Sequence, residues 1–140
     1  MKLELVTLSG VTYSGQVYEI GIPTAAGYIS VYPDHMPLIS LATPGVLTVR
    51  RTKETDYVDT YATYGGVVEV DGDTVRILMD EVEHADELVE NEIRAAYEKA
   101  QQMKADAQSD IEIERAQALI DRQMVRLRVA DLKRRPRRRS

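Results

Sequence analysis

The residues in this sequence that could do chemistry are carboxylates, arginines and two histidines, because the chain has no cysteine. Without cysteine it forms neither disulfides nor cysteine-based zinc sites or nucleophiles. Residues 80–92 contain seven acidic residues and no lysine or arginine. The acidic residues are Asp80, Glu81, Glu83, Asp86, Glu87, Glu90 and Glu92. Their spacing is not that of a metal site, whereas acids are stabilised at the positive end of a helix dipole. We expect a helix to begin there, with His84 as a surface residue among acids and no metal.

The other short motifs do not assemble a catalytic site. Asp34-His35 could form a catalytic pair, but no serine lies in a G-x-S-x-G elbow. Asp71-Gly72-Asp73 begins like a calcium loop and lacks the later ligands and the terminal glutamate. Neither a P-loop nor a G-x-G-x-x-G motif is present. We therefore expect neither an independent enzyme nor a cofactor.

A basic group lies near the C-terminus. Arg115, Arg122, Arg126 and Lys133 recur at seven, four and seven residues, which places them on one helix face. That face is either solvated or docks on an acidic partner. The segment 133–140 forms a basic tail with six positive charges. Because the whole chain has a net charge of −5, residues 1–132 have a net charge of −5 − 6 = −11. The tail suits nucleic acid, anionic lipid or an acidic protein, but so acidic a body disfavours nucleic acid.

Two halves of different periodicity must position these groups. All eight glycines and every proline but Pro136 precede residue 85, and positions such as Leu3 and Leu5 alternate with polar ones. Asp71-Gly72 predicts a type I′ hairpin, Gly65-Gly66 a bulge or close backbone approach, and the Thr- and Tyr-rich segment 53–64 a strand. About eight to ten short strands at this spacing predict an antiparallel β-sandwich over residues 1–84.

Residues 85–140 have the helical period instead. Apolar residues step by three or four from Ala85 to Ala107 and again from Ile113 to Ala130. Ser109 and Glu112 fit a capping box, which predicts two helices of about 22 to 24 residues that meet between 107 and 110. A short connection makes them an antiparallel hairpin, and alanine-rich stripes bury little area. The expected fold is α+β, a β-sandwich followed by a weakly docked helical hairpin.

Several segments resemble one protein family. Gly27-Tyr28-Ile29-Ser30-Val31-Tyr32-Pro33-Asp34-His35-Met36-Pro37-Leu38-Ile39 resembles the G-x-x-G-I-x-P-x-H-x-P-L motif of the epsilon subunits of F-type ATP synthases. Thr43-Pro44-Gly45-Val46-Leu47, Gly65-Gly66-Val67-Val68-Glu69-Val70 and Leu127-Arg128-Val129 resemble further segments of that family in the same order. The likeness covers nearly the whole chain. Ser30 and Asp34 stand where glycine is common, and Tyr28 stands where an acid is common.

The resemblance implies a non-catalytic subunit of the central stalk, which couples proton-driven rotation of the c-ring to ATP synthesis through gamma. The sandwich would contact gamma and the c-ring through Tyr28, Ile29, Ser30, Val31, Pro33, His35 and Pro37. The hairpin would fold on the sandwich or extend into the alpha/beta catalytic head and inhibit hydrolysis. Arg115, Arg122, Arg126 and Lys133 would then contact an acidic segment of beta. The chain would lie at the cytoplasmic face of the cell membrane, associated with it only through the complex.

Two other function classes remain open at this stage. The chain could be a general interaction module whose helices form a coiled coil with another partner, and a pull-down that recovers no gamma subunit would favour that class. It could also bind nucleic acid through residues 133–140. Salt-sensitive DNA binding that disappears when the tail is removed would favour the latter.

We predict that the chain has no tight ATP site. Some bacterial epsilon subunits bind ATP through an I/L-D-x-x-R-A stretch in the first helix. The corresponding segment Val89-Glu90-Asn91-Glu92-Ile93-Arg94-Ala95 has Glu90 in place of aspartate, and its arginine is displaced by one position to Arg94. One residue turns a helical side chain by about 100°, away from the expected ligand. Calorimetric titration should detect no micromolar ATP binding, and such binding would contradict the prediction.

Overall fold

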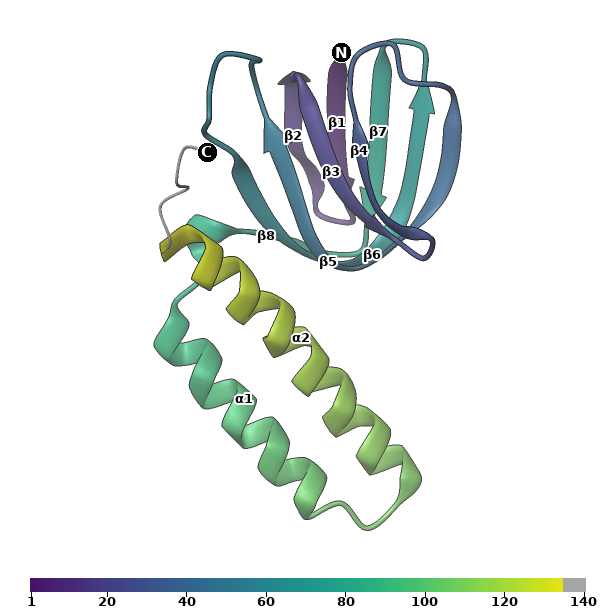
Figure 1. Cartoon of the computed structure of the whole chain (residues 1–140). Helices are drawn as coiled ribbons and strands as arrows, with labels where there is room; N and C mark the ends of the chain where they lie inside the picture. Colours follow the sequence, from purple (N-terminus) through teal and green to yellow (C-terminus); the bar gives the residue numbers. More distant parts are fainter. Residues whose placement is uncertain (135–140) are drawn as a thin grey trace.

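The computed structural model describes residues 1–134, with the backbone alone at Arg134. Eight strands precede a short 3-10 turn and two helices, and the hairpin of helices projects from one end of the sandwich (Figure 1). The strands are β1 (Lys2–Thr7), β2 (Gly10–Gln16), β3 (Glu19–Thr24), β4 (Gly27–Val31), β5 (Leu38–Arg50), β6 (Asp59–Asp71), β7 (Thr74–Met79) and β8 (Val82–His84). The turn η1 (Ala85–Glu87) leads to α1 (Glu90–Ala105) and α2 (Asp110–Arg134). The expected α+β fold, strands first and a helical hairpin second, is confirmed.

The strands lie in the order β2-β1-β7-β6-β5-β3-β4, with β8 beside β6. All pairs are antiparallel except β1 with β7. A parallel pair is possible here because the two strands are distant in sequence and no tight turn has to join them. Strand β6 links the two layers, since its first half pairs with β8 and its second half with β7.

The core of the sandwich is built from alternating apolar positions. Leu3 and Leu5 on β1, Ile20 and Ile22 on β3, and Val75 and Ile77 on β7 are essentially inaccessible to water. The alternation that predicted strands therefore also identified their buried face, because successive side chains of a strand point to opposite sides.

Two details of the strands differ from expectation. The β6–β7 turn has Gly72 and Asp73 at its centre, and only Gly72 has a positive φ, of 59°. The turn is therefore of type II′ rather than I′, which needs positive φ at both positions. Asp73 is held by β1, because its carbonyl accepts the Lys2 amide at 2.7 Å. The strand expected over 53–64 begins only at Asp59, and residues 51–58 form a loop.

The first helix is shorter than predicted. It has 16 residues rather than about 23, because Ala85–Glu87 form the 3-10 turn and both Leu88 and Val89 are extended. Acids do lie at the start of each element, as expected for the positive end of a helix dipole. The second helix has 25 residues.

The capping box at the start of α2 is confirmed with one change. The Glu112 amide donates to Ser109 Oγ at 3.2 Å. The Glu112 carboxylate accepts from the Gln108 amide at 2.8 Å instead of the Ser109 amide. The two side chains thus satisfy two amides at the turn between the helices.

Gly66 allows the backbones of β6 and β7 to approach closely. The strand register is unbroken on either side of the Gly65-Gly66 pair, so the feature is a close approach and not a bulge. A Cβ at position 66 would overlap the Leu78 carbonyl oxygen. We expect Gly66→Ala to lower the free energy of unfolding by about 3 kcal/mol in urea titrations.

Gly15→Ala is the matched control for this prediction. A Cβ at Gly15 would meet only the movable end of the Tyr13 ring, at 3.3 Å. We expect the control to change the free energy of unfolding by less than about 1 kcal/mol. Equal losses in the two variants would contradict the close approach.

Candidate functional site

The segment predicted to face a ring of partner subunits lies on and after the edge strand β4, which among the described strands pairs only with β3. Tyr28, Ser30, Pro33 and Pro37 are exposed, and Ile29 and His35 are half-buried. Val31 is fully buried in the sandwich core and offers no surface to a partner.

The two departures from glycine in this segment are structurally accommodated. Asp34 has a φ of 67°, the left-handed conformation that glycine adopts most easily and that aspartate tolerates. The His35 amide closes this turn on the Tyr32 carbonyl at 3.2 Å. Ser30 is an ordinary strand residue opposite Gly21. The turn geometry that glycine usually supplies is therefore retained.

A row of apolar side chains crosses five strands on the outer face of the sheet. The strand register places Leu41 beside Val67, Val67 beside Leu78, Leu78 beside Val6, and Val6 beside Val11. Leu41 and Val11, at the two ends of the row, are both 67% exposed. We call these five residues the apolar row. Exposed apolar side chains that neighbour one another make this row a candidate docking surface.

The sequence did not predict the apolar row. Each member is a single apolar residue at a solvent-facing position, which is common in soluble proteins. Only the register across β5, β6, β7, β1 and β2 brings the five together. The available signal was the excess of valine and leucine at outward positions of several strands.

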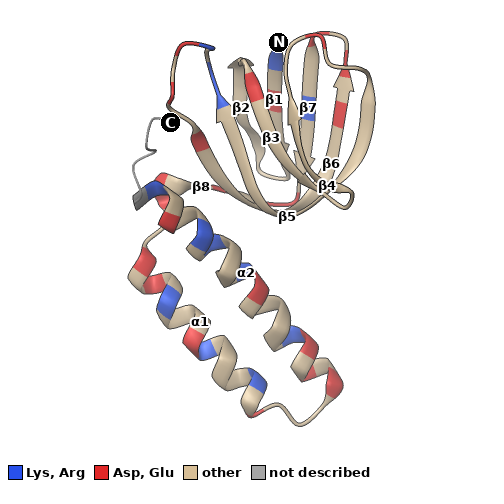
Figure 2. Cartoon of the chain, viewed as in Figure 1, with Lys and Arg blue, Asp and Glu red and all other residues tan. Residues whose placement is uncertain are grey.

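The basic face of α2 meets acids of the sandwich and of the hinge, the name that we give to residues 80–89 between β7 and α1. Figure 2 shows basic residues along α2 and acidic residues near β8. Arg122 binds Glu81 through two hydrogen bonds, of 2.9 and 2.6 Å. Its guanidinium carbon lies 4.1 Å from the centre of the Tyr64 ring. Lys133 forms an ion pair of 3.0 Å with Asp86. With Arg126, which contacts Glu83, three of the four predicted basic residues contact acids of the chain itself.

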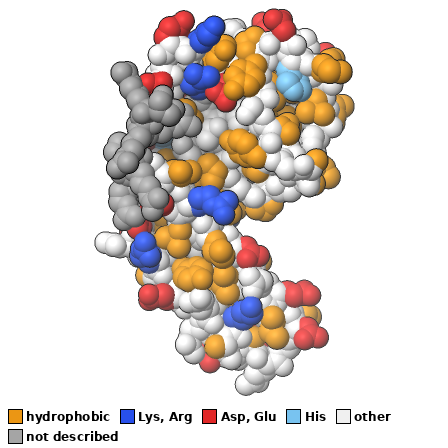
Figure 3. Space-filling view, viewed as in Figure 1, with side chains coloured by type: hydrophobic (Ala, Val, Ile, Leu, Met, Phe, Trp, Pro, Cys, Tyr) orange, Lys and Arg blue, Asp and Glu red, His pale blue; other side chains and the backbone are white. Residues whose placement is uncertain are grey.

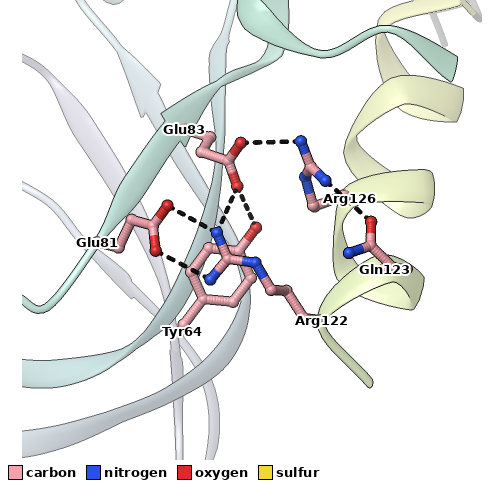
Figure 4. A network of polar contacts seen from close by, with 6 residues as sticks. All are labelled: Tyr64, Glu81, Glu83, Arg122, Gln123 and Arg126. Atoms are coloured by element: carbon pink, nitrogen blue, oxygen red, sulfur yellow. Dashed lines mark hydrogen bonds and ion pairs between the residues drawn. The ribbon is translucent and has the colours of Figure 1, made fainter. Parts of the chain in front are cut away.

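Glu83 on β8 joins the two arginines, as Figure 4 shows. It accepts a hydrogen bond of 2.5 Å from the Tyr64 hydroxyl and lies 3.4 Å from Arg122 and 3.2 Å from Arg126. Gln123, which is buried, accepts a hydrogen bond from Arg126 at 2.9 Å. We call these six residues the latch: Tyr64, Glu81, Glu83, Arg122, Gln123 and Arg126.

The latch keeps its groups in the charge states that hold it together. The hydrogen bond from Arg122 lowers the pKa of Glu81, and the same bond raises the pKa of Arg122. Burial, and then the hydrogen bond to Glu83, raise the pKa of Tyr64 well above its ordinary value. At neutral pH Arg122 therefore faces Glu81 as a guanidinium beside a carboxylate, and the Tyr64 hydroxyl is neutral.

Arg115 lies on the same face of α2 as Arg122 and Arg126 but beyond the sandwich. It is exposed and forms no ion pair with any residue that the structure describes. The four predicted basic residues thus share a face, yet the chain neutralises three and leaves Arg115 to solvent.

The apolar contact between the hairpin and the sandwich is small. Val129 is fully buried in a cluster with Ala62, Ala85, Leu88 and Ile93. The seam between the helices has Ala100 on α1 and Ala116 and Ile120 on α2 as buried members. Ile113 and Met124, which belong to the apolar stripe predicted over Ile113 to Ala130, are exposed. Small side chains contribute little buried area, so the ion pairs form a large part of the docking contact.

The hinge also contains His84, which we expected at the surface. It is half-buried instead, with Nε2 3.2 Å from Asp59 Oδ1, and its Nδ1 accepts the Asp86 amide at 3.0 Å. The histidine therefore fastens the end of β8 to β6 and caps the η1 turn. Within residues 1–133 the side chains form no His, Cys, Asp or Glu group suited to a metal ion.

The residues corresponding to the nucleotide motif bond to each other. Arg94 Nη2 lies 2.8 Å from Glu90 Oε1, and the arginine is exposed in the first turns of α1. The absence of a tight ATP site stays a prediction.

Replacing Glu83 tests whether the latch holds the hairpin. Arg126 has no other carboxylate in the described chain, and its Nε is already buried without a hydrogen-bond partner. We expect Glu83→Gln to reduce the hydrogen-exchange protection of Val125–Ala130 amides by about 1–2 kcal/mol, with little change in the β1 and β7 amides.

Glu81→Gln provides the comparison on the same network. Glu81 is 49% exposed, and Arg122 would still face Glu83. The protection of the same amides should fall by less than about 1 kcal/mol. If both variants left exchange unchanged, the network would have no part in docking.

Comparisons with known proteins agree on one family. Residues 1–85 match the family model described as ATP synthase, Delta/Epsilon chain, beta-sandwich domain. The chain is 38% identical to the ATP synthase epsilon chain of Chloroflexus aggregans, covering 100% of this chain and 99% of the relative. It is 35% identical to that of Herpetosiphon aurantiacus, covering 96% of both.

Among solved structures, the fold is similar to a chain of the Euglena gracilis mitochondrial ATP synthase, in a complex described as OSCP, F1 and c-ring. The TM-score is 0.79 at 21% identity, with coverage of 93% of this chain and 79% of the other. This similarity shows that the arrangement of sandwich and helices is that of the solved chain.

Proposed function

The chain belongs to the ATP synthase epsilon-chain family, and on that premise we propose that it couples c-ring rotation to ATP synthesis through gamma while its hairpin can inhibit ATP hydrolysis. Family membership makes it a subunit of the ATP synthase complex rather than an independent enzyme. Neither α1 nor α2, as far as the structure describes them, is long and apolar enough to cross a membrane. We place the subunit at the cytoplasmic face of the membrane, held there by the complex.

The apolar row is the surface that we assign to gamma. It lies on the outer face of a sheet whose other face is the sandwich core, so its side chains are available for docking on a preformed sheet. A subunit that transmits torque needs such a preformed contact, because an interface that has to order itself on binding loses part of its interaction energy. The apolar row supplies the apolar surface that a stable contact with gamma would bury.

We assign the c-ring contact to the exposed residues between Tyr28 and Pro37, on and after strand β4. Tyr28, Ser30, Pro33 and Pro37 are uncharged, and Met36 beside them is 78% exposed. A contact made by these side chains is apolar or hydrogen-bonded rather than ionic. Tyr28, at the position where an acid is common in the family, supports this assignment.

The latch is the observation that carries the inhibitory role. Arg122, Arg126 and Lys133 are the residues that we assign to an acidic segment of beta, and Glu81, Glu83 and Asp86 now occupy them. Extension of the hairpin would exchange one set of carboxylates for another. Such an exchange keeps the number of ion pairs similar, so the two states can be close in free energy. Arg115, unpaired in the described chain, is available for the first contact.

Nucleic-acid binding has no supporting feature in the described residues. The basic tail assigned to 133–140 lies outside them except for Lys133 and the backbone of Arg134. Lys133 itself is paired with Asp86.

Two variants of the assembled enzyme separate the two roles. We expect deletion of residues 85–140 to raise ATP hydrolysis several-fold and to leave gamma co-purification intact, because the apolar row lies within 1–84. We expect Val67→Asp in the full chain to reduce gamma co-purification, because it places a charge at the centre of the row.

Thr60→Asp is a suitable control for Val67→Asp, since Thr60 lies on the same strand, outside the row, and is only half-buried. Unchanged hydrolysis after the deletion would leave the structural role alone. Retention of gamma by Val67→Asp would remove the row from the interface.

A further inference from the structure

A cavity of about 420 Å³ lies in the seam between α2 and the sandwich. Among the residues that the structure describes, its lining combines the apolar side chains of Pro23, Pro44, Val46 and Leu132 with one cation, Arg128, and with hydroxyl groups such as that of Thr48. Figure 3 shows hydrophobic side chains gathered where the sandwich meets the hairpin, with basic side chains among them. The volume is within the range of small-molecule sites. We call this space the seam cavity.

Arg128 is the exception among the cations of α2 near the sandwich. Arg122, Arg126 and Lys133 each bind a carboxylate of the chain. No carboxylate of the described residues lies within ion-pair distance of Arg128, which is exposed at the rim of the seam cavity. A guanidinium beside apolar surface, without a counter-ion, is complementary to an anion that brings apolar area with it.

The hydroxyl groups around the seam cavity are largely engaged already. Tyr28 and Thr48 bond to each other at 2.9 Å, and Thr24 donates to the Gly27 carbonyl at 2.5 Å. A ligand rich in hydroxyl or amide groups would find few partners there. The chemistry of the lining therefore selects a ligand with a single polar, negatively charged end.

We propose that the seam cavity binds an amphipathic organic monoanion, an aliphatic chain that ends in a carboxylate. The carboxylate binds the Arg128 guanidinium, and the aliphatic chain lies against Pro23, Val46 and Leu132. The site is distinct from the latch, whose arginines are occupied by Glu81 and Glu83.

The seam cavity exists only while the hairpin is docked, since Arg128 and Leu132 come from α2 and the other lining residues from the sandwich. A ligand bound there stabilises the docked hairpin by mass action. This regulatory consequence rests on the proposed function, because only then does docking of the hairpin affect ATP hydrolysis. The binding itself does not depend on it.

Decanoate tests the proposal on the isolated full-length chain, with decanol and acetate as probes that lack the charge and the aliphatic chain respectively. Calorimetry should show saturable decanoate binding, about tenfold weaker for decanol, and none for acetate. In NMR spectra the amides of Gly27, Gly45 and Leu132 should shift on titration. Arg128→Gln should weaken decanoate binding about tenfold, and Arg115→Gln, an exposed arginine far from the seam, should leave it unchanged.

Three results would overturn the proposal. One is decanoate binding that Arg128→Gln leaves as tight as in the parent chain. Another is a set of NMR shifts centred on the apolar row instead of the seam. The third is equal affinity for decanoate and decanol, which compares probes on the unaltered chain and does not depend on how any variant folds. None of these results bears on gamma co-purification or on the hydrolysis of the truncated enzyme, so the two proposals fail independently.

Discussion

The arrangement of this molecule depends on the ion pairs between one face of α2 and the acids of β8 and the hinge. The apolar contact beneath them is a small cluster around Val129, and the seam between the helices consists largely of alanine and single isoleucines. Partly buried ion pairs lose much of their Coulomb gain to desolvation, so they specify a position more than they strengthen it. The hairpin is therefore held in a defined orientation by contacts that another acidic surface can replace.

Strand β6 connects the two functional surfaces of the chain. Tyr64 lies in the latch and Val67 lies in the apolar row, three residues apart on one strand. Gly66, between them, leaves no room for a Cβ against the Leu78 carbonyl of β7. A partner on the outer face and the hairpin at the end of the sandwich thus act on one continuous backbone, with no flexible loop between them.

Local patterns in the sequence predicted the strands and helices, whereas the latch and the apolar row depend on contacts between residues far apart in the sequence. Leu3 and Leu5 revealed a strand with one buried face, and Ser109 with Glu112 located the start of α2, because these signals extend over a few residues. The spacing of Arg122 and Arg126 placed them on one face of a helix. It did not identify Glu81 and Glu83 as partners, which lie about 40 residues earlier in the chain. The apolar row, the half-buried His84 and the extended pair Leu88-Val89 escaped prediction for the same reason, since each depends on the register of distant strands or on competition among turn geometries.

The two extended residues between η1 and α1 limit how the hairpin can travel. Leu88 and Val89 span at most about 7 Å, and η1 is anchored to the sandwich through His84 and the buried Ala85. A hairpin that stays intact can pivot about this short tether but cannot drift away from it. Longer excursions require α1 and α2 to part, or η1 to unwind. The two-residue linker, rather than the length of the helices, therefore limits how far the intact hairpin can move from the sandwich.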